Sequence, residues 1–282
     1  MSTKVSVYIP AYNAEKTIEI SLNSVLNQTL VASEIIVIDD NSSDKTVELI
    51  NKYSEVKLIK NHSNFGLGFN RNLAINNSNN EFVASIDADV ELNKDWLEIL
   101  VDKLNEEKTV MCGGRMYEKY ISVAANSWRA KYYSQNWGSV DKINPNFLFG
   151  CNTILKKKNW RQVNGYDENL KTNGEDIDFS NKLKQIPDVN LYYSSKAICY
   201  HLQNDTTDTL SKRIWRYHSF GYKIKKPSIY RTLKLSIKQI KFFLTRSFNN
   251  LLNFEFNFVY INFAILFKFI VLEHKYYKKN KK

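Results

Sequence analysis

The sequence predicts an α/β protein in which a mixed, mostly parallel sheet is flanked by helices and followed by a C-terminal helical extension. Three observations support this fold class. Apolar runs typical of buried strands alternate with segments of helical periodicity along most of the chain. Acidic residues close several of these apolar runs, and the charge balance changes sharply near the C-terminus. With 282 residues, 43% of them hydrophobic, the chain can bury a substantial core.

Predicted strands and helices are joined by short links, which is the pattern of a sheet covered by helices. In residues 15–28, for example, Ile18, Leu22 and Val25 lie on one helical face. Strands are expected at residues 5–12 (stopped by Pro10), 34–40, 56–61, 81–92 and 191–202. Helices are expected at residues 15–28, 41–53, 64–78, 93–104 and 174–186, and a strand followed by a short helix within 152–170.

The charge distribution divides the chain into two parts. Residues 1–211 contain 23 Lys and Arg against 27 Asp and Glu, whereas residues 212–282 contain 17 against 2. A mildly acidic body is therefore followed by a strongly basic tail. We expect a catalytic domain at residues 1–222 and a basic, aromatic-rich helical extension at residues 223–282.

Cysteine content and the N-terminal sequence indicate a cytoplasmic protein. The three cysteines, Cys112, Cys151 and Cys199, are an odd number without paired metal-ligand spacing, which is typical of a reducing compartment. The first residues, MSTKVSVYIP, lack the apolar stretch of a secretory signal.

Two acids in the segment FVASIDADVEL suggest a metal site. If residues 81–92 form one strand, Asp87 and Asp89 share a face and repel each other at its end. They could cap the next helix or pair with a distant arginine, although Asn93 and Asp95 occupy better capping positions. A divalent cation would relieve the repulsion, and oxygen ligands favour Mg²⁺ or Mn²⁺.

An ordered set of motifs extends this reading. VSVYIPAYN, IIVIDDNSSDKT, GFNRN, SIDADV, NGYDE, GEDIDF and CYHL follow one another along the chain. Together they resemble glycosyltransferase family 2, whose members are inverting nucleotide-sugar transferases with the Rossmann-like GT-A fold. The resemblance covers roughly residues 3–222, and it is the ordered set that is specific, since each motif is permissive alone.

The resemblance implies a role for particular residues in binding the nucleotide-sugar donor. The segment after the first strand would form the floor of the nucleotide pocket, and the acid closing the second strand would read the base, usually uracil. The first acid of the Asp-x-Asp pair would reach the ribose. These expected donor-side residues are Pro10, Ala11, Tyr12, Asn13, Asp39 with the adjacent Asp40, Arg71, Asp87 and Glu175.

The same resemblance implies a metal site and a catalytic base. Asp89 would bind the metal, Mg²⁺ or Mn²⁺, and His201 would lie at the metal or the diphosphate. Asp176 would be the base that deprotonates the acceptor. From the residues alone, Glu175 and Asp176 could instead only favour a helix N-terminus, and His201 could be a hydrogen-bonded core histidine.

Two departures from related groups narrow the expected reaction. The region LSKRIWRYHSFGY lacks the Gln-x-x-Arg-Trp motif of processive synthases, and IPAYNAEKT is not the glycine-rich loop of sugar nucleotidyltransferases. We therefore expect transfer of one sugar from a UDP-type donor to a hydroxyl. The acceptor would be a glycan or lipid-linked precursor in cell-surface polysaccharide, lipopolysaccharide or glycolipid synthesis.

The basic tail leaves several interpretations open. Residues 254–272 are mostly apolar but are interrupted by Glu255, Asn257, Asn262 and Lys268, which makes them marginal as a transmembrane span. Basic flanks on both sides favour peripheral association with the anionic inner face of the cell membrane. The tail could alternatively pack on the body or on a second subunit. A non-catalytic sugar-binding or nucleic-acid-binding protein is the alternative to an enzyme, but nucleic acid is not the expected partner.

Overall fold

The computed structural model describes residues 3–219 and 228–280. The described residues form two compact units. Unit 1 comprises the chain up to Lys119 together with Gln135–Leu202, and unit 2 comprises Tyr120–Ser134 and the chain from Gln203 onward. The domain boundary expected at residue 222 lies outside the described residues.

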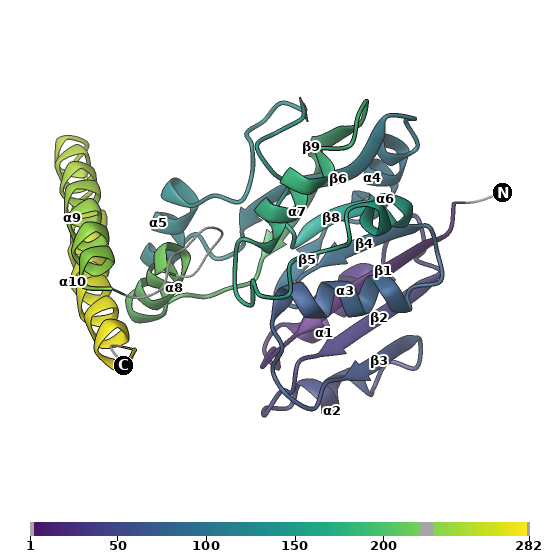
Figure 1. The fold of residues 1–282 in the computed structure, drawn as a ribbon, viewed down its shortest axis with the longest axis horizontal. Helices are drawn as coiled ribbons and strands as arrows, with labels where there is room; N and C mark the ends of the chain where they lie inside the picture. The colour runs from purple at the N-terminus through teal and green to yellow at the C-terminus, as the bar shows by residue number, and fades with distance from the viewer. Residues whose placement is uncertain (1–2, 220–227, 281–282) are drawn as a thin grey trace. The chain divides into compact units, whose positions relative to one another are not determined.

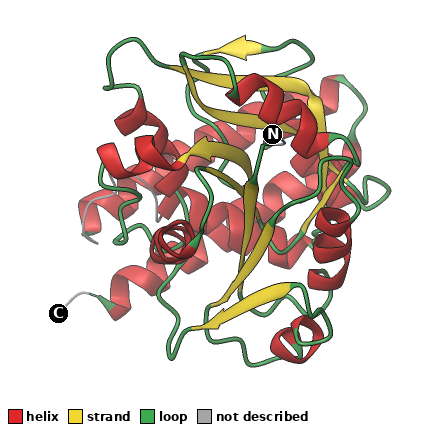
Figure 2. Cartoon of the chain, turned by 90° about the vertical axis from the view of Figure 1, so that its right-hand side faces the viewer, coloured by secondary structure: helices red, strands yellow, loops and turns green. Residues whose placement is uncertain are grey.

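Within the described residues, unit 1 contains a single sheet of nine strands (Figure 2). Its first half is parallel, as expected from the sequence, and the remaining strands make the sheet mixed. The parallel strands β3 (Val56–Lys60), β2 (Glu34–Asp39), β1 (Val5–Ala11) and β4 (Phe82–Ile86) lie in that order, and β1 continues through Pro10. The order continues with β8 (Asn152–Lys156), β6 (Thr109–Glu118), β9 (Asn190–His201) and β5 (Val90–Leu92), while β7 (Lys142–Ile143) pairs with β9.

Helices cover both faces of this sheet because strand side chains alternate between the faces. Val5, Val7 and Ile9 of β1 belong to one buried cluster, whereas Tyr8 belongs to the other. The first cluster is covered by α1 (Ile18–Leu26), α2 (Thr46–Ile50) and α4 (Trp96–Leu104). The second is covered by α3 (Leu67–Asn77), α6 (Lys157–Gln162) and α7 (Glu175–Leu183), and α3 and α7 are labelled in Figure 1.

Unit 2 is helical and has its own apolar core. It contains α5 (Ala124–Tyr132), α8 (Thr207–Ser219), α9 (Ile229–Leu252) and α10 (Phe256–Lys279), and α9 and α10 run side by side (Figure 1). The indole of Trp128 is fully buried, and its N–H donates to Asn262 Oδ1 at 2.8 Å. This unit therefore has a core of its own.

Two predictions about strands were wrong, and one strand was missed. The first strand does not stop at Pro10, because β1 continues to Ala11. Residues 81–92 do not form one strand, because β4 ends at Ile86 and a turn closed by the Val90 N–H to Asp87 carbonyl bond (3.1 Å) separates it from β5. The two acids therefore lie in a turn and not on one face of a strand. Strand β6 was not anticipated, because Gly113 and Gly114 weaken its pattern.

Candidate active site

The first part of the site is the edge where β1 and β2 end. Ala11 is opposite Asp39 in the parallel register, so the segment after β1 and the acid closing β2 meet there. Asn13 has a positive φ of 50°, and its side-chain oxygen accepts a 2.8 Å hydrogen bond from the Ser43 backbone N–H. Pro10 and Ala11 are buried, whereas Tyr12 is 53% exposed. The chain beside Asp39 therefore changes from buried at Ala11 to exposed at Tyr12.

Asp39 and Asp40 are adjacent but have different surroundings. Both are buried. Within the described residues, the side-chain carboxylate of Asp39 accepts only long bonds, 3.3 and 3.4 Å, from the Ser42 N–H. Asp40 accepts from the backbone N–H groups of Phe65 (2.9 Å) and Gly66 (2.8 Å) and from Asn61. These bonds commit Asp40 to holding the loop before α3, so Asp39 is the better placed of the two for a ligand.

Arg71 on α3 is the central residue of the site and is 1% exposed. Its Nη1 donates to Ser85 Oγ (2.6 Å) and to the Gly150 carbonyl (2.9 Å). Its Nη2 lies 3.0 Å from Asp87 Oδ1, and its Nε lies 3.4 Å from Glu175 Oε1. One planar guanidinium thus connects the end of β4 with the start of α7.

The pKa values of the carboxylates beside Arg71, partly buried Asp87 and buried Glu175, are shifted by their surroundings. Burial raises the pKa of Asp87, the Arg71 charge opposes that rise, and the Asp89 charge adds to it. Burial, followed by the charge of Asp176, raises the pKa of Glu175 to about 7. The second carboxylate oxygen of Glu175 is buried and has no hydrogen-bond partner within residues 3–219 and 228–280. The surroundings of Glu175 therefore favour its protonated form more than those of an exposed glutamate would.

Asp176 lies in the first turn of α7, where the helix dipole favours a negative charge. Its Oδ2 accepts from the Gly150 N–H at 3.3 Å, and its Oδ1 accepts from the Ile177 N–H at 2.8 Å. Burial raises the pKa of Asp176, while these backbone bonds lower it. Gly150 therefore contacts Arg71 through its carbonyl and Asp176 through its N–H. The carbonyl of the following residue, Cys151, accepts a 3.3 Å hydrogen bond from the Asp87 N–H.

Asp89, in the turn between β4 and β5, lies close to His201 at the end of β9. Asp89 Oδ2 lies 3.4 Å from His201 Nε2, and Glu118 Oε2 lies 3.1 Å from His201 Nδ1. Burial alone would lower the pKa of His201, but the Asp89 and Glu118 carboxylates raise it. Glu118, at the end of β6 and opposite His201 in the register, was not predicted.

Asp89 and His201 fit a divalent metal whose remaining coordination positions are filled by a bound substrate. In the described part of the chain, no group of three His, Cys, Asp or Glu side chains is arranged to hold an ion. One carboxylate, Asp89, and one imidazole, His201, lie together, and Glu118 holds the imidazole from its other ring nitrogen, as outer carboxylates do around metal-binding histidines. Mg²⁺ and Mn²⁺ commonly take only one or two protein ligands beside substrate phosphates.

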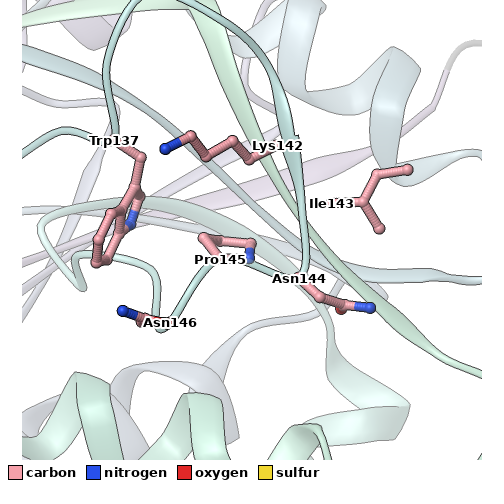
Figure 3. A pocket seen from close by; sticks show the side chains of 6 residues that line it. All are labelled: Trp137, Lys142, Ile143, Asn144, Pro145 and Asn146. Atoms are coloured by element: carbon pink, nitrogen blue, oxygen red, sulfur yellow. The ribbon is translucent and has the colours of Figure 1, made fainter.

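A cavity of about 330 Å³ lies elsewhere in unit 1, lined by Trp137 and residues 142–146 (Figure 3). The Lys184 ammonium, at the C-terminal end of α7, bonds to the carbonyls of Pro145 and Asn146 in its wall. Eight residues of helix separate Lys184 from Asp176, which is about 12 Å at 1.5 Å per residue. The indole N–H of Trp137 is already bonded to the Phe147 carbonyl at 2.7 Å. This cavity therefore lies near the C-terminal end of α7, whereas Asp176 lies at its N-terminal end.

Comparison with known proteins identifies the family. A sequence model of glycosyl transferase family 2 matches residues 6–162, more than half of the chain. The chain belongs to glycosyltransferase family 2. A second model, described as the N-terminal domain of galactosyltransferase, matches residues 129–203 of this family 2 glycosyltransferase.

Individual relatives agree with the family. Chondroitin synthase of Escherichia coli is 25% identical over 84% of the chain, but the match covers 34% of the synthase. The chain thus spans about a third of the length of this relative. A UDP-Glc:alpha-D-GlcNAc-diphosphoundecaprenol beta-1,3-glucosyltransferase of Escherichia coli is 32% identical over 54% of the chain and 59% of its own length.

Solved structures agree with the fold. A mannosyltransferase from Pyrobaculum calidifontis, solved with GDP-Man and Mn²⁺, superposes with a TM-score of 0.66. The two are 15% identical, and the match covers 97% of this chain and 87% of that one. The α/β fold and the family expected from the sequence are thereby confirmed.

Proposed function

We propose that this glycosyltransferase moves one sugar, with inversion, from a UDP-type donor to a hydroxyl of a glycan or lipid-linked acceptor. One observation carries the proposal. Arg71 and the turn at Gly150 bring Asp87 and Asp176 to one edge of the sheet, although they are far apart in the sequence. Donor-side and acceptor-side acids are thus held in one fixed arrangement, which positioning catalysis requires.

The donor would lie along the ends of β1, β2 and β4. The segment from Pro10 to Asn13 supports the nucleotide. Asp39 accepts a hydrogen bond from the base, and Asp87, oriented by Arg71, accepts one from the ribose. Their support is the shared edge, the weakly engaged carboxylate of Asp39 and the 3.0 Å bond that orients Asp87. Glu175 contributes to donor binding indirectly, because it pairs at 3.4 Å with Arg71, which orients Asp87.

Asp89 and His201 would hold a divalent metal, Mn²⁺ or Mg²⁺. The ion would supply Lewis-acid stabilisation of the charge that gathers on the leaving diphosphate. The mannosyltransferase with the same fold was solved with Mn²⁺, which supports this assignment without selecting between the two ions. Glu118 keeps the imidazole of His201 in the orientation that turns Nε2 toward Asp89.

Asp176 would act as the general base. One of its carboxylate oxygens takes the proton of the acceptor hydroxyl while the hydroxyl oxygen forms a bond to the anomeric carbon. The bond from that carbon to the phosphate oxygen breaks on the opposite face, and nucleoside diphosphate leaves. The acceptor is proposed from the relatives, one of which acts on a diphosphoundecaprenol-linked sugar by its name.

Release of nucleoside diphosphate tests the proposed function. We expect the full chain, given Mn²⁺ or Mg²⁺ and a panel of UDP- and GDP-sugars with diphosphoundecaprenol-linked acceptors, to release UDP from at least one donor. Chelation with EDTA should stop the release, and either metal should restore it. Release that is insensitive to EDTA would contradict the metal assignment, and activity only with GDP-sugars would contradict the donor class.

Replacement of Glu118 by glutamine should weaken metal binding. Glu118→Gln removes the charge behind His201, and loss of such an outer partner typically costs about 10- to 100-fold in metal affinity. We expect the Mn²⁺ concentration for half-maximal UDP release to rise accordingly, with activity recovered at high Mn²⁺. The exposed Glu107→Gln is the matched control and should behave like the unaltered protein.

The pH dependence of transfer should reflect the raised carboxyl pKa values. The base must be unprotonated, and burial raises the pKa of Asp176 while Glu175 beside it has a pKa of about 7. We therefore expect kcat/KM to fall with decreasing pH well above the usual titration range of an aspartate. Glu175→Gln removes a neighbouring negative charge and should move this acid limb to lower pH. An unmoved limb would show that the two acids do not interact during catalysis.

A further inference from the structure

Helix α9 exposes a continuous stripe of large apolar side chains. The members are spaced three or four residues apart, so they lie on one face of the helix. Exposure is high for a folded chain, reaching 66% at Ile237 and 61% at Phe248. The stripe consists of Ile229, Leu233, Ile237, Ile240, Leu244, Phe248 and Leu251.

Helix α10 exposes a second stripe with the same kind of spacing. Phe267 is 72% exposed and Tyr260 is 70% exposed, while Phe254 in the short link between the helices is 80% exposed. Contiguous apolar surface of this extent is uncommon on a soluble monomer and marks an interaction site. The α10 stripe consists of Phe256, Tyr260, Phe263, Phe267 and Ile270.

The side of α10 opposite its apolar stripe packs inside unit 2, where buried polar groups hold it. Asn262 is fully buried between the Trp128 indole N–H, 2.8 Å away, and Asn250, to which it donates at 3.0 Å. Glu273 is also fully buried and accepts from Arg231 Nη1 at 2.9 Å. By length and composition, α10 could cross a membrane, with a hydropathy of 1.6. Crossing would separate these groups from their partners, which is costly in lipid. These contacts therefore favour an α10 that lies on a surface over one that spans a membrane.

Positive charge accompanies the α9 stripe. Lys234, Lys238 and Lys241 are exposed and repeat at the same spacing, so they form a second stripe beside the apolar one. Residues 212–282 carry 17 basic residues against two acidic ones. An apolar stripe edged by lysines is typical of helices that lie in the interface of anionic membranes. Two copies of so basic a surface would repel each other, which argues against a second copy as the occupant.

We propose that the apolar stripes of α9 and α10, with the adjoining lysines, form a docking surface for an anionic lipid bilayer. The helices lie in the headgroup region with their apolar side chains in lipid, and no helix spans. This inference goes beyond the proposed function, because it concerns where the enzyme works and not its reaction. It follows that lipid-linked acceptors would be met at the membrane surface.

Vesicle flotation of the full chain tests the docking surface. We expect flotation with vesicles that contain phosphatidylglycerol, little with phosphatidylcholine alone, and release by high salt. The double variant Phe263→Ser with Phe267→Ser should lower the fraction bound at limiting lipid by about tenfold or more, because two deeply inserted side chains are lost. Lys234→Glu with Lys238→Glu should weaken binding to anionic vesicles only. Val31→Ser with Val140→Ser replaces equally exposed apolar residues of unit 1 and should change nothing.

Three results would overturn the proposal. They are absence of flotation with anionic vesicles, binding that survives the Phe263 and Phe267 replacements, and resistance to extraction by alkaline carbonate, which indicates a spanning helix. Dimerisation in light scattering that is lost in the same variant, without vesicle binding, would assign the stripes to a second copy. Retention on nucleic acid but not on vesicles would assign them to nucleic acid. Because flotation needs no donor, UDP release measured separately distinguishes failure of docking from failure of the proposed function.

Discussion

Asp176→Asn should abolish sugar transfer and leave donor binding nearly unchanged. The substitution keeps the size of the side chain and the oxygen that accepts from the Gly150 N–H, but an amide cannot take the proton of the acceptor hydroxyl. We expect kcat to fall by about 10²- to 10⁴-fold, the usual contribution of a general base. Binding of UDP-sugar, measured by titration calorimetry with Mn²⁺ present, should stay within about twofold of the unaltered protein, since no donor contact is removed.

Asp178→Asn is the matched control for this substitution. Asp178 is one position beyond Ile177 on the same helix, and its carboxylate pairs with Lys182 at 2.9 Å, away from Gly150. We expect transfer by this variant to be close to normal. If Asp176→Asn lost donor binding, the residue would belong to the donor side. If Asp178→Asn lost transfer instead, the base would have been assigned to the wrong acid of the motif.

The sequence was sufficient for the half of the site that is built from local patterns. Continuous apolar runs ending in acids predicted β2 and β4, and parallel strands place their carboxyl ends at one edge. Asp39 and Asp87 lie at such ends. The acidic start of α7 was also predictable, because Asp and Glu favour the first turn of a helix.

The other half depends on contacts between distant segments. An alternation of apolar and acidic residues fits one long strand and also strand, turn and strand, so it could not show that Asp87 faces Arg71 while Asp89 faces His201. Strand β6 was missed because its glycines are required by close contacts with distant segments and not by a local sequence pattern. A Cβ at Gly114 would lie 2.3 Å from the Ala197 carbonyl oxygen. Without β6, nothing in the sequence could bring Glu118 to His201.

Arg71→Met should cause the largest loss of stability of any substitution in the site. Arg71 is the only partner recorded for Glu175 Oε1 and for Asp87 Oδ1 in the described chain, and it is itself buried. Its removal leaves the buried Glu175 and the partly buried Asp87 without their counter-charge. Breaking a buried ion pair in this way typically costs about 3–5 kcal/mol of unfolding free energy. Arg161→Met is the control, because Arg161 is exposed and only 3.9 Å from Glu81, and it should cost no more than about 0.5 kcal/mol.

The pH dependence of this loss identifies its cause. Without the guanidinium, the pKa values of Asp87 and Glu175 in the folded protein rise further above those of the unfolded chain. A group with a raised folded pKa stabilises the protein at low pH, and that contribution disappears as the pH rises through the folded value. The deficit of Arg71→Met should therefore be smaller at pH 5 than at pH 8 in thermal unfolding of the full chain. A deficit equal at both pH values would indicate lost packing of the arginine side chain, and the buried charges would then not be what this residue holds in place.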